Sequence, residues 1–187
     1  MIFRTTPSQT VGPYLSIGLP FSDGPFVVPE GTAGAIRITG NVFDGDGTPI
    51  PDHLIETWQA DPDGHFADLH GHAGPSPLPG FRGFGRDGAE DGDGSYEIIT
   101  VKPGRVPGPG GRPQAPHIDV SLFARGMLHR CVTRIYFADE PEANAEDVVL
   151  ASVPIERRET LLAQPTDNGY QFDIRLQGPS ETVFFDL

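Results

Sequence analysis

The 187-residue chain has little cysteine, few basic residues and no long apolar run. Its single cysteine, Cys131, excludes an internal disulfide and gives no sign of an oxidising compartment. Thirteen Lys and Arg residues stand against 26 Asp and Glu residues, and the net charge of −13 disfavours phosphate backbones and anionic lipid as partners. No apolar stretch approaches a membrane span, and the first residues lack the pattern of a secretion signal. We therefore expect a cytoplasmic protein that binds neither nucleic acid nor membrane.

Glycine and proline are abundant instead, with 24 and 20 residues. They interrupt alternating apolar segments and do not form tracts, which is typical of a loop-rich β protein. The chain length suits one domain that covers residues 1–187. Residues 1–34 are especially rich in proline and glycine, and we interpret them as an ordered N-terminal arm that packs on a partner.

Seven short segments alternate apolar and polar residues with a period of two, as strands with one buried face do. They cover residues 35–43, 54–60, 96–101, 117–124, 131–137, 170–176 and 183–185. Residues 140–150 and 155–163 have helix-forming composition. The sequence therefore predicts a mainly β fold, an antiparallel β-sandwich with long loops and one or two short helices. Residues 61–94 form the longest irregular insertion, and insertions of this length are usually functional or mobile.

Two glycine-rich patterns have a simpler explanation than ligand binding. Residues 83–88 match the dinucleotide-binding pattern, but a loop precedes them and no helix follows, so we interpret the match as chance. Asp-Gly repeats at residues 44–47, 61–64 and 91–94 lack the later oxygen ligands of a calcium loop. They predict turns between strands.

The segment from Gln114 to Asp119 carries part of a metal-binding pattern. Alternate residues of a strand point to one face, so His117 and Asp119 emerge on the same side. A His-x-His pair there would offer two imidazoles to a metal ion. In this chain the second imidazole is replaced by a carboxylate.

Several segments together resemble the intradiol ring-cleavage dioxygenases. They are Asp-Gly-Ser-Tyr at 93–96, Thr-Val-Lys-Pro-Gly at 100–104, Pro-His-Ile-Asp at 116–119 and Arg-Ile-Tyr-Phe at 134–137. The resemblance runs through nearly the whole chain, and residues 121–125, 157–161 and 181–186 are similar to the alpha type of chain in that family. It implies the β-sandwich of the intradiol dioxygenases.

The resemblance also locates a degenerate iron site. In the family, two tyrosinates and two histidines hold Fe³⁺, a hard ion that anionic oxygen ligands stabilise. The corresponding positions of this chain are Phe66, Val106, His117 and Asp119, and an arginine of the family falls at Gln114. Phe and Val carry no side-chain oxygen. We therefore expect this chain to hold no metal and no catalytic residue, and to be inactive alone.

An alpha-type chain implies a catalytic partner. The resemblance implies hetero-oligomeric alpha-beta units in which the beta subunit carries the Fe³⁺ and cleaves protocatechuate with O₂ to 3-carboxy-cis,cis-muconate. The substrate-binding positions that it implies for this chain are Thr10, Gly12, Pro13, Tyr14 and Arg125. Arg125 would supply a cation to the carboxylate of the aromatic substrate, which a chain of this net charge would otherwise repel.

Several alternatives remain open from the sequence. The chain could be a stand-alone zinc or ferrous enzyme, or a β-sandwich that only binds ligands or proteins. The first alternative would use His65, His70, His72, His117 and Asp119. Arg125 could merely cap a strand end, and His117 could bond to Asp119 directly or through water. The arm and residues 183–185 are the expected exposed apolar surfaces.

Overall fold

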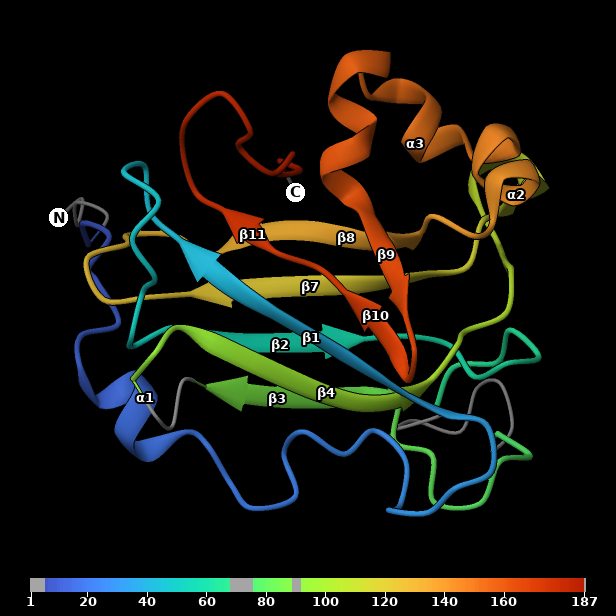
Figure 1. Ribbon diagram of the computed structural model, residues 1–187, viewed down its shortest axis with the longest axis horizontal. Coiled ribbons are helices and arrows are strands. Elements are labelled where there is room, and N and C mark those ends of the chain that lie inside the picture. The colour runs from blue at the N-terminus through green and yellow to red at the C-terminus, as the bar shows by residue number, and fades with distance from the viewer. Residues whose placement is uncertain (1–5, 68–75, 89–91, 187) are drawn as a thin grey trace, which may run out of the picture.

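Two layers of β-strands form the body of the molecule in the computed structural model, which describes residues 6–67, 76–88 and 92–186. One layer contains β1 (Ala35–Phe43), β4 (Ser95–Val101), β10 (Gly169–Gln171) and β11 (Ile174–Arg175). The other contains β2 (Leu54–Trp58), β3 (Phe84–Gly88), β7 (His117–Phe123) and β8 (Cys131–Phe137). The predicted mainly β fold is confirmed, and Figure 1 shows β1 running obliquely across the second layer.

The two layers belong to one nearly closed sheet because β9 (Leu162–Thr166) joins them. Strand β9 pairs with β8 in parallel and with β10 in antiparallel orientation. Strand β1 also pairs in parallel with both β10 and β11. The remaining pairs, β1 with β4 and the run β3, β2, β7 and β8, are antiparallel as expected.

The core lies between the layers and consists of the inward-facing residues of each strand. The central residues Ile38 of β1, Ile98 of β4 and Ile118 of β7 are about 1% exposed or less. Burial of an Ile or Leu side chain contributes about 1.5–3 kcal/mol, so this alternation fixes which face of each strand is inside. His117 and Asp119 flank Ile118 and therefore lie on the outer face of the second layer.

Short helices cover the ends of the strands. Helix α1 (Tyr14–Gly18) lies in the arm, and α2 (Pro141–Glu146), α3 (Val148–Ser152) and the 3-10 helix η2 (Ile155–Leu161) follow β8. A 3-10 turn η1 (Pro109–Gly111) separates β5 (Val106–Pro107) from β6 (Pro113–Gln114). The helical prediction for 140–150 and 155–163 is confirmed except at its end, where β9 begins. In the described part of the chain, no helix has both the length and the apolar character needed to cross a membrane.

Three strand predictions need correction. The uninterrupted strand 170–176 is two strands, because the regular pairing with β1 is interrupted at residues 172–173; the Phe172 N–H still donates to the Thr39 carbonyl. Residues 183–185 are not a strand; Val183 and Phe185 are half-buried against the core, so this segment is not the exposed apolar surface we expected. Strand β3 was missed because its glycines and charges hide the alternation of a strand.

The expectation of Asp-Gly turns is confirmed at residues 44–47 and 61–64. The Asp44 carboxylate accepts from the backbone N–H groups of Asp46 and Thr48, both at 2.9 Å. The Asp61 carboxylate does the same for Asp63 and His65, at 3.0 and 2.8 Å. These carboxylates satisfy the backbone of their own turns, which is the usual role of Asp in such sequences.

Candidate functional site

The degenerate metal positions gather around the start of β7. His117 is 6% exposed and its Nδ1 lies 2.7 Å from the Ala115 carbonyl oxygen. The Phe66 ring stacks on Trp58 with 6.3 Å between centroids and 4° between planes. Trp58 is in turn the strand partner of Asp119. Val106 is 4% exposed and pairs with Gln114 in the small β5–β6 hairpin.

Asp119 is paired with an arginine and not with His117. Its strand partner on β8 is Arg134, whose Nε lies 2.8 Å from Asp119 Oδ1. The direct hydrogen bond between His117 and Asp119 that we considered is therefore absent. Arg134 Nη1 also donates to Gln114 Oε1 at 2.7 Å, so the guanidinium joins two of the degenerate positions.

The network continues from β8 to helix α3. Arg134 Nη1 donates to the Tyr136 hydroxyl at 3.4 Å, which donates to Asp147 Oδ1 at 3.2 Å. Asp147 is fully buried, and it accepts from the backbone N–H groups of Ala115, Val149 and Leu150 at 2.7–2.8 Å. Burial raises the pKa of Tyr136 well above its usual value, so its phenol stays protonated.

Burial also lowers the pKa of His117, and the positive charge of Arg134 lowers it further. The imidazole is therefore neutral near pH 7. A neutral imidazole and a carboxylate are both possible metal ligands. The carboxylate, however, already bonds to an internal cation.

These donors do not fit a ferric ion. Phe66 and Val106 offer no oxygen, Tyr136 is an internal hydrogen-bond donor, and Asp119 is engaged by Arg134. In the described ranges, no group of three or more His, Cys, Asp or Glu residues could hold a metal ion. His65 lies 3.6 Å from Asp61, whose carboxylate is part of a turn. His70 and His72, which the metalloenzyme alternative needs, lie outside the described residues.

The predicted substrate-binding residues lie in the arm and after β7, and one hydrogen bond brings the two segments together. Thr10 Oγ1 accepts from the N–H of Gly126 at 2.8 Å and from the N–H of Gly12 at 3.4 Å. Gly126 directly follows Arg125, whose side chain is 61% exposed. Pro13 precedes helix α1, and Tyr14 at its start is 78% exposed.

Asp52 holds the Arg125 side chain by an ion pair with 3.0 Å between Arg125 Nε and Asp52 Oδ2. The carboxylate is only 18% exposed, and Asp52 Oδ2 has no hydrogen-bond partner among the described residues, so its contact with Arg125 is an ion pair without hydrogen-bond geometry. This pair uses the inner nitrogen of the guanidinium. Asp52 could not be predicted from the sequence, because its segment precedes β2 and is far from Arg125 along the chain.

An apolar cavity of about 300 Å³ lies beside this cation, between the arm and the turn that links β7 to β8. Its lining residues are Val11, Phe123, Ala124, Met127, Leu128, His129 and Arg130. Leu128 is 56% exposed and Val11 is 45% exposed, so apolar side chains surround the segment that carries Arg125. Such a surface suits an apolar partner or an aromatic ring.

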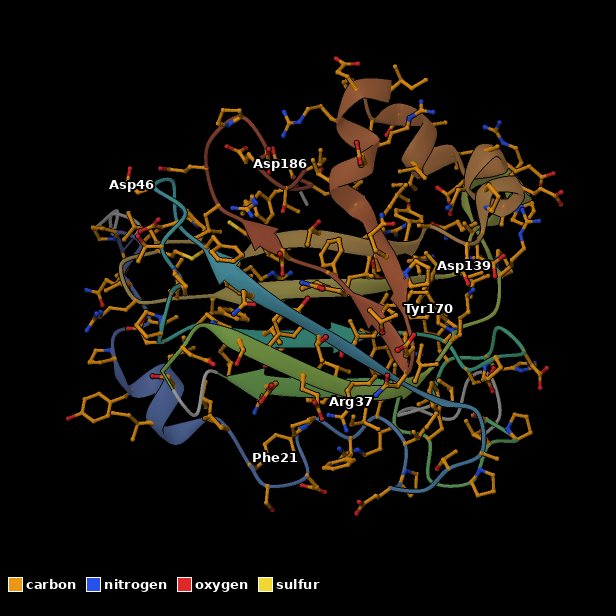
Figure 2. The ribbon with its side chains drawn as sticks, viewed as in Figure 1. Phe21, Arg37, Asp46, Asp139, Tyr170 and Asp186 are labelled. Carbon is orange, nitrogen blue, oxygen red and sulfur yellow. The ribbon has the colours of Figure 1, made fainter. Side chains whose placement is uncertain are left out.

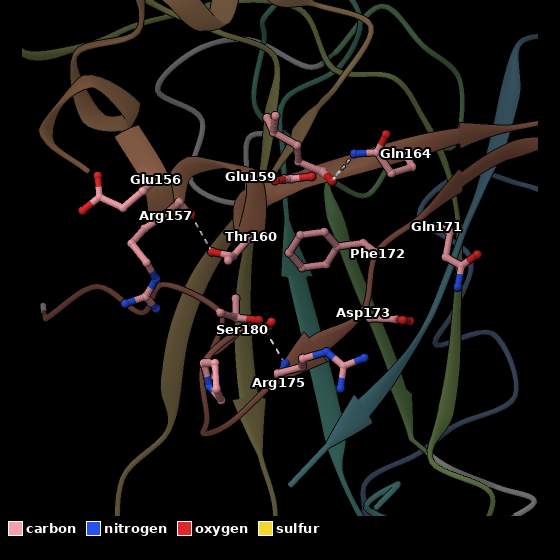
Figure 3. Close-up of a pocket in the computed structure, with 13 residues that line it drawn as sticks. Glu156, Arg157, Glu159, Thr160, Gln164, Gln171, Phe172, Asp173, Arg175 and Ser180 are labelled. Atoms are coloured by element: carbon pink, nitrogen blue, oxygen red, sulfur yellow. Dashed lines mark hydrogen bonds between the residues drawn. The ribbon is translucent and has the colours of Figure 1, made fainter. Parts of the chain in front are cut away.

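A second cavity, of about 580 Å³, lies between η2 and the C-terminal strands and contains none of the predicted residues (Figure 3). Arg157 and Arg175 enter it together with Glu156, Glu159 and Asp173. Its charges are mixed, and the hydrogen bonds within it, such as Thr160 Oγ1 to the Arg157 carbonyl at 2.8 Å, stabilise the local loops.

A third group of polar side chains is structural. Tyr170 donates to Asp139 Oδ2 at 2.8 Å, and Figure 2 shows these two residues near each other at one end of the sheet. Lys102 Nζ lies 3.1 Å from Asp139 and 2.6 Å from Glu140. These ion pairs tie β4 to the segment after β8.

Known proteins with similar sequences belong to one family of dioxygenases. The sequence profile of a family described as dioxygenase matches residues 11–178. The alpha chains of protocatechuate 3,4-dioxygenase from Burkholderia cepacia and Pseudomonas putida are both 41% identical to this chain. The alignments cover 98% of both sequences in the first case, and 97% of this chain and 96% of the relative in the second.

The beta chain from Burkholderia cepacia is 36% identical over 79% of this chain and 66% of its own length. A solved dioxygenase domain from Streptomyces sp. SirexAA-E, part of a fusion with a carbohydrate-binding protein, superposes with a TM-score of 0.58. It is 27% identical, over 96% of this chain and 100% of the domain. The chain therefore belongs to the intradiol dioxygenase family, as a relative of the alpha chains of protocatechuate 3,4-dioxygenase.

Proposed function

We propose that this chain is the non-catalytic alpha subunit of a protocatechuate 3,4-dioxygenase and completes the active-site pocket of a beta subunit that carries the Fe³⁺. Two findings support this assignment. The chain is similar to named alpha chains over nearly its full length. Its own donors at the positions that match the family's iron ligands do not fit Fe³⁺, which supports a metal held by a partner.

The single observation that carries the pocket role is the hydrogen bond from Gly126 to Thr10. It fastens the arm beside Arg125, although the two segments are far apart in sequence. We assign Thr10, Gly12, Pro13, Tyr14 and Arg125 to the surface that the beta subunit covers. Gly12 has a φ of 71°, a conformation that favours glycine, and its missing side chain leaves room for a ring.

In the proposed complex, Arg125 binds the carboxylate of protocatechuate. Asp52 holds its Nε, and the outer nitrogens of the guanidinium remain for a bidentate contact with the substrate. The iron of the beta subunit supplies the activation of the catechol toward O₂. The net reaction adds both oxygen atoms of O₂ to protocatechuate and gives 3-carboxy-cis,cis-muconate. The role of this chain is to bind and orient the substrate and to exclude water.

The proposal treats residues 1–187 as one domain with the arm, residues 1–34, on the beta subunit. Apolar side chains support a buried surface there: Tyr14 is 78%, Ile17 73% and Leu19 44% exposed. An exposed apolar surface of this kind is typical of a subunit interface. The absence of disulfides suits assembly in the cytoplasm, where protocatechuate would be degraded.

Co-expression with a beta chain tests the proposal. The chain alone should have no ring-cleaving activity, and the co-purified complex should convert protocatechuate. In the complex, Arg125→Ala should lower kcat/KM for protocatechuate. The loss should correspond to about 2–5 kcal/mol of transition-state stabilisation if the ion pair between Arg125 and the substrate carboxylate is shielded from water. Catechol, which lacks that carboxylate, should be affected far less.

Arg112→Ala is the control. Arg112 is exposed between η1 and β6, so its substitution removes the same charge from another part of the surface. Activity and iron content should match the unsubstituted complex. An Arg125→Ala complex with full iron content and unchanged kcat/KM for protocatechuate would remove Arg125 from the pocket. Activity of the chain alone would contradict the non-catalytic role.

A further inference from the structure

The outer face of β7 presents two metal-ligand types without a third. His117 and Asp119 point to the same side of the strand, and the next strand places Arg134 opposite Asp119. Arg134 is half-buried, with 19% of its side chain exposed, and its Nε lies 2.8 Å from the carboxylate. The Arg134 guanidinium therefore lies beside Asp119, where a metal ion bound to this carboxylate would lie.

Other contacts fix the guanidinium in this position. Gln114 Oε1 accepts from Arg134 Nη1 at 2.7 Å, and the Tyr136 hydroxyl lies 3.4 Å from the same nitrogen. Tyr136 is itself held by the buried Asp147. Arg134 is thus bound on several sides by oxygen atoms from β6, β7 and β8, which is how a protein surrounds a metal ion with oxygen ligands.

We infer that Arg134 is a built-in cation that takes the place of a metal ion beside His117 and Asp119 and keeps divalent and trivalent metal ions out. Two physical effects act together. Arg134 Nε is in an ion pair with Asp119 Oδ1 at 2.8 Å, so one of the two carboxylate oxygens that a metal ion would need already has a cationic partner. Its fixed positive charge also repels any second cation at a few ångströms, where water screens the interaction incompletely.

Restoration of a histidine at position 119 should not suffice to create a metal site while Arg134 is present. Removal of Arg134 should allow binding even though Phe66 and Val106 still lack oxygen atoms, because two imidazoles at alternate strand positions chelate Ni²⁺.

The experiment measures Ni²⁺ binding to the purified full chain by isothermal titration calorimetry at pH 7.5. All variants carry His70→Ala and His72→Ala, which remove a second His-x-His pair. Asp119→His is compared with the double variant Asp119→His/Arg134→Gln. We expect the double variant to bind Ni²⁺ more tightly by about tenfold or more.

The control is Asp119→His/Arg86→Gln, which has the same net charge as the double variant. Arg86 is 23% exposed and pairs with Glu56 at 2.6 Å, so it is a matched ion-paired arginine away from β7. It should bind Ni²⁺ no better than Asp119→His alone. An equal gain from the control, or no gain from Arg134→Gln, would overturn the inference.

Thermal unfolding of each variant shows whether it is folded. If the Asp119→His variants do not fold, Arg134→Gln alone provides the test. It frees the native Asp119 carboxylate beside His117 and should bind Ni²⁺ more tightly than the background chain. A folded Arg134→Gln chain with background affinity would also overturn the inference.

Discussion

At the scale of single residues, two arginine–carboxylate ion pairs have different roles. Arg134 pairs with Asp119 on the face where the family would hold iron, and Arg125 pairs with Asp52 on the surface beside the arm. The two arginines differ in exposure, 19% against 61%. The half-buried Arg134 contacts Asp119, Gln114 and Tyr136 of its own chain, whereas the exposed Arg125 can still bind an anionic ligand.

Asp52→Asn should weaken the binding of protocatechuate to the complex, because Asp52 holds the Arg125 side chain. Without its carboxylate partner the exposed arginine samples more rotamers, so part of the binding energy is lost in ordering it. We expect KM to rise about two- to fivefold with little change in kcat, the range that exposed ion pairs give. Steady-state kinetics with protocatechuate and with catechol measure the effect, which should be absent for catechol.

Glu146→Gln is the matched control for this substitution, because Glu146 pairs with Arg105 at 2.7 Å near α2 and has no part in the proposed pocket. Its kinetics should be those of the unsubstituted complex. A normal KM for Asp52→Asn together with a large effect of Arg125→Ala would show that Asp52 does not position the arginine.

At the scale of elements, β1 and the segment between β10 and β11 approach each other very closely. A Cβ atom at Gly40 would lie 1.8 Å from the Phe172 carbonyl oxygen and 2.9 Å from Tyr96 Cε1. The same carbonyl accepts from the buried Tyr96 hydroxyl at 2.5 Å. Glycine at this position therefore lets the backbone at Phe172 approach β1 closely.

Gly40→Ala should lower the free energy of unfolding by about 1–3 kcal/mol, because the added methyl group forces the two segments apart. Urea denaturation followed by tryptophan fluorescence measures the change. Gly18→Ala is the control: no heavy atom lies within 4 Å of its added Cβ, so its stability should stay within about 0.5 kcal/mol. An unchanged midpoint for Gly40→Ala would contradict the close approach.

At the scale of the whole molecule, stability should fall in acid through buried histidine. His53 is fully buried, its Nδ1 bonds to the Ile50 carbonyl at 2.9 Å, and its Nε2 has no partner among the described residues. Burial lowers the pKa of His53 below its usual value of about 6.5. The unfolded chain therefore binds this proton more readily than the folded chain does.

Neutral His53 therefore contributes fully to the free energy of unfolding above pH 7. This contribution is lost as the pH falls below about 6.5, by at most about 1.4 kcal/mol per pH unit, because the unfolded chain takes up the proton first. His53→Asn, which can keep the donor to Ile50, should make the decrease of stability between pH 7.5 and 5 shallower. Urea denaturation across this range measures it. The exposed His129→Asn should keep the original slope, and an unchanged slope for His53→Asn would refute the prediction.

The strands and the loss of iron ligands were predictable from sequence, because both depend on local residue identity. Alternation of apolar residues marked β1 and most of β7, since one face of each is buried there, and consecutive apolar residues marked the end of β8, where both faces are buried. Phe66 and Val106 lack ligand oxygens in any conformation. The sequence by itself therefore determined a mainly β chain of this family in which Phe66 and Val106 carry no ligand oxygen.

Only the tertiary structure decided which distant groups meet. Arg134 lies on the strand next to Asp119, and Asp52 and Thr10 approach the segment of Arg125 from remote parts of the chain. No spacing in the sequence encodes these contacts, because strand order and register set them. The break at Phe172 and the parallel pairings of β9 and β1 have the same origin: packing between layers overrides the local alternation.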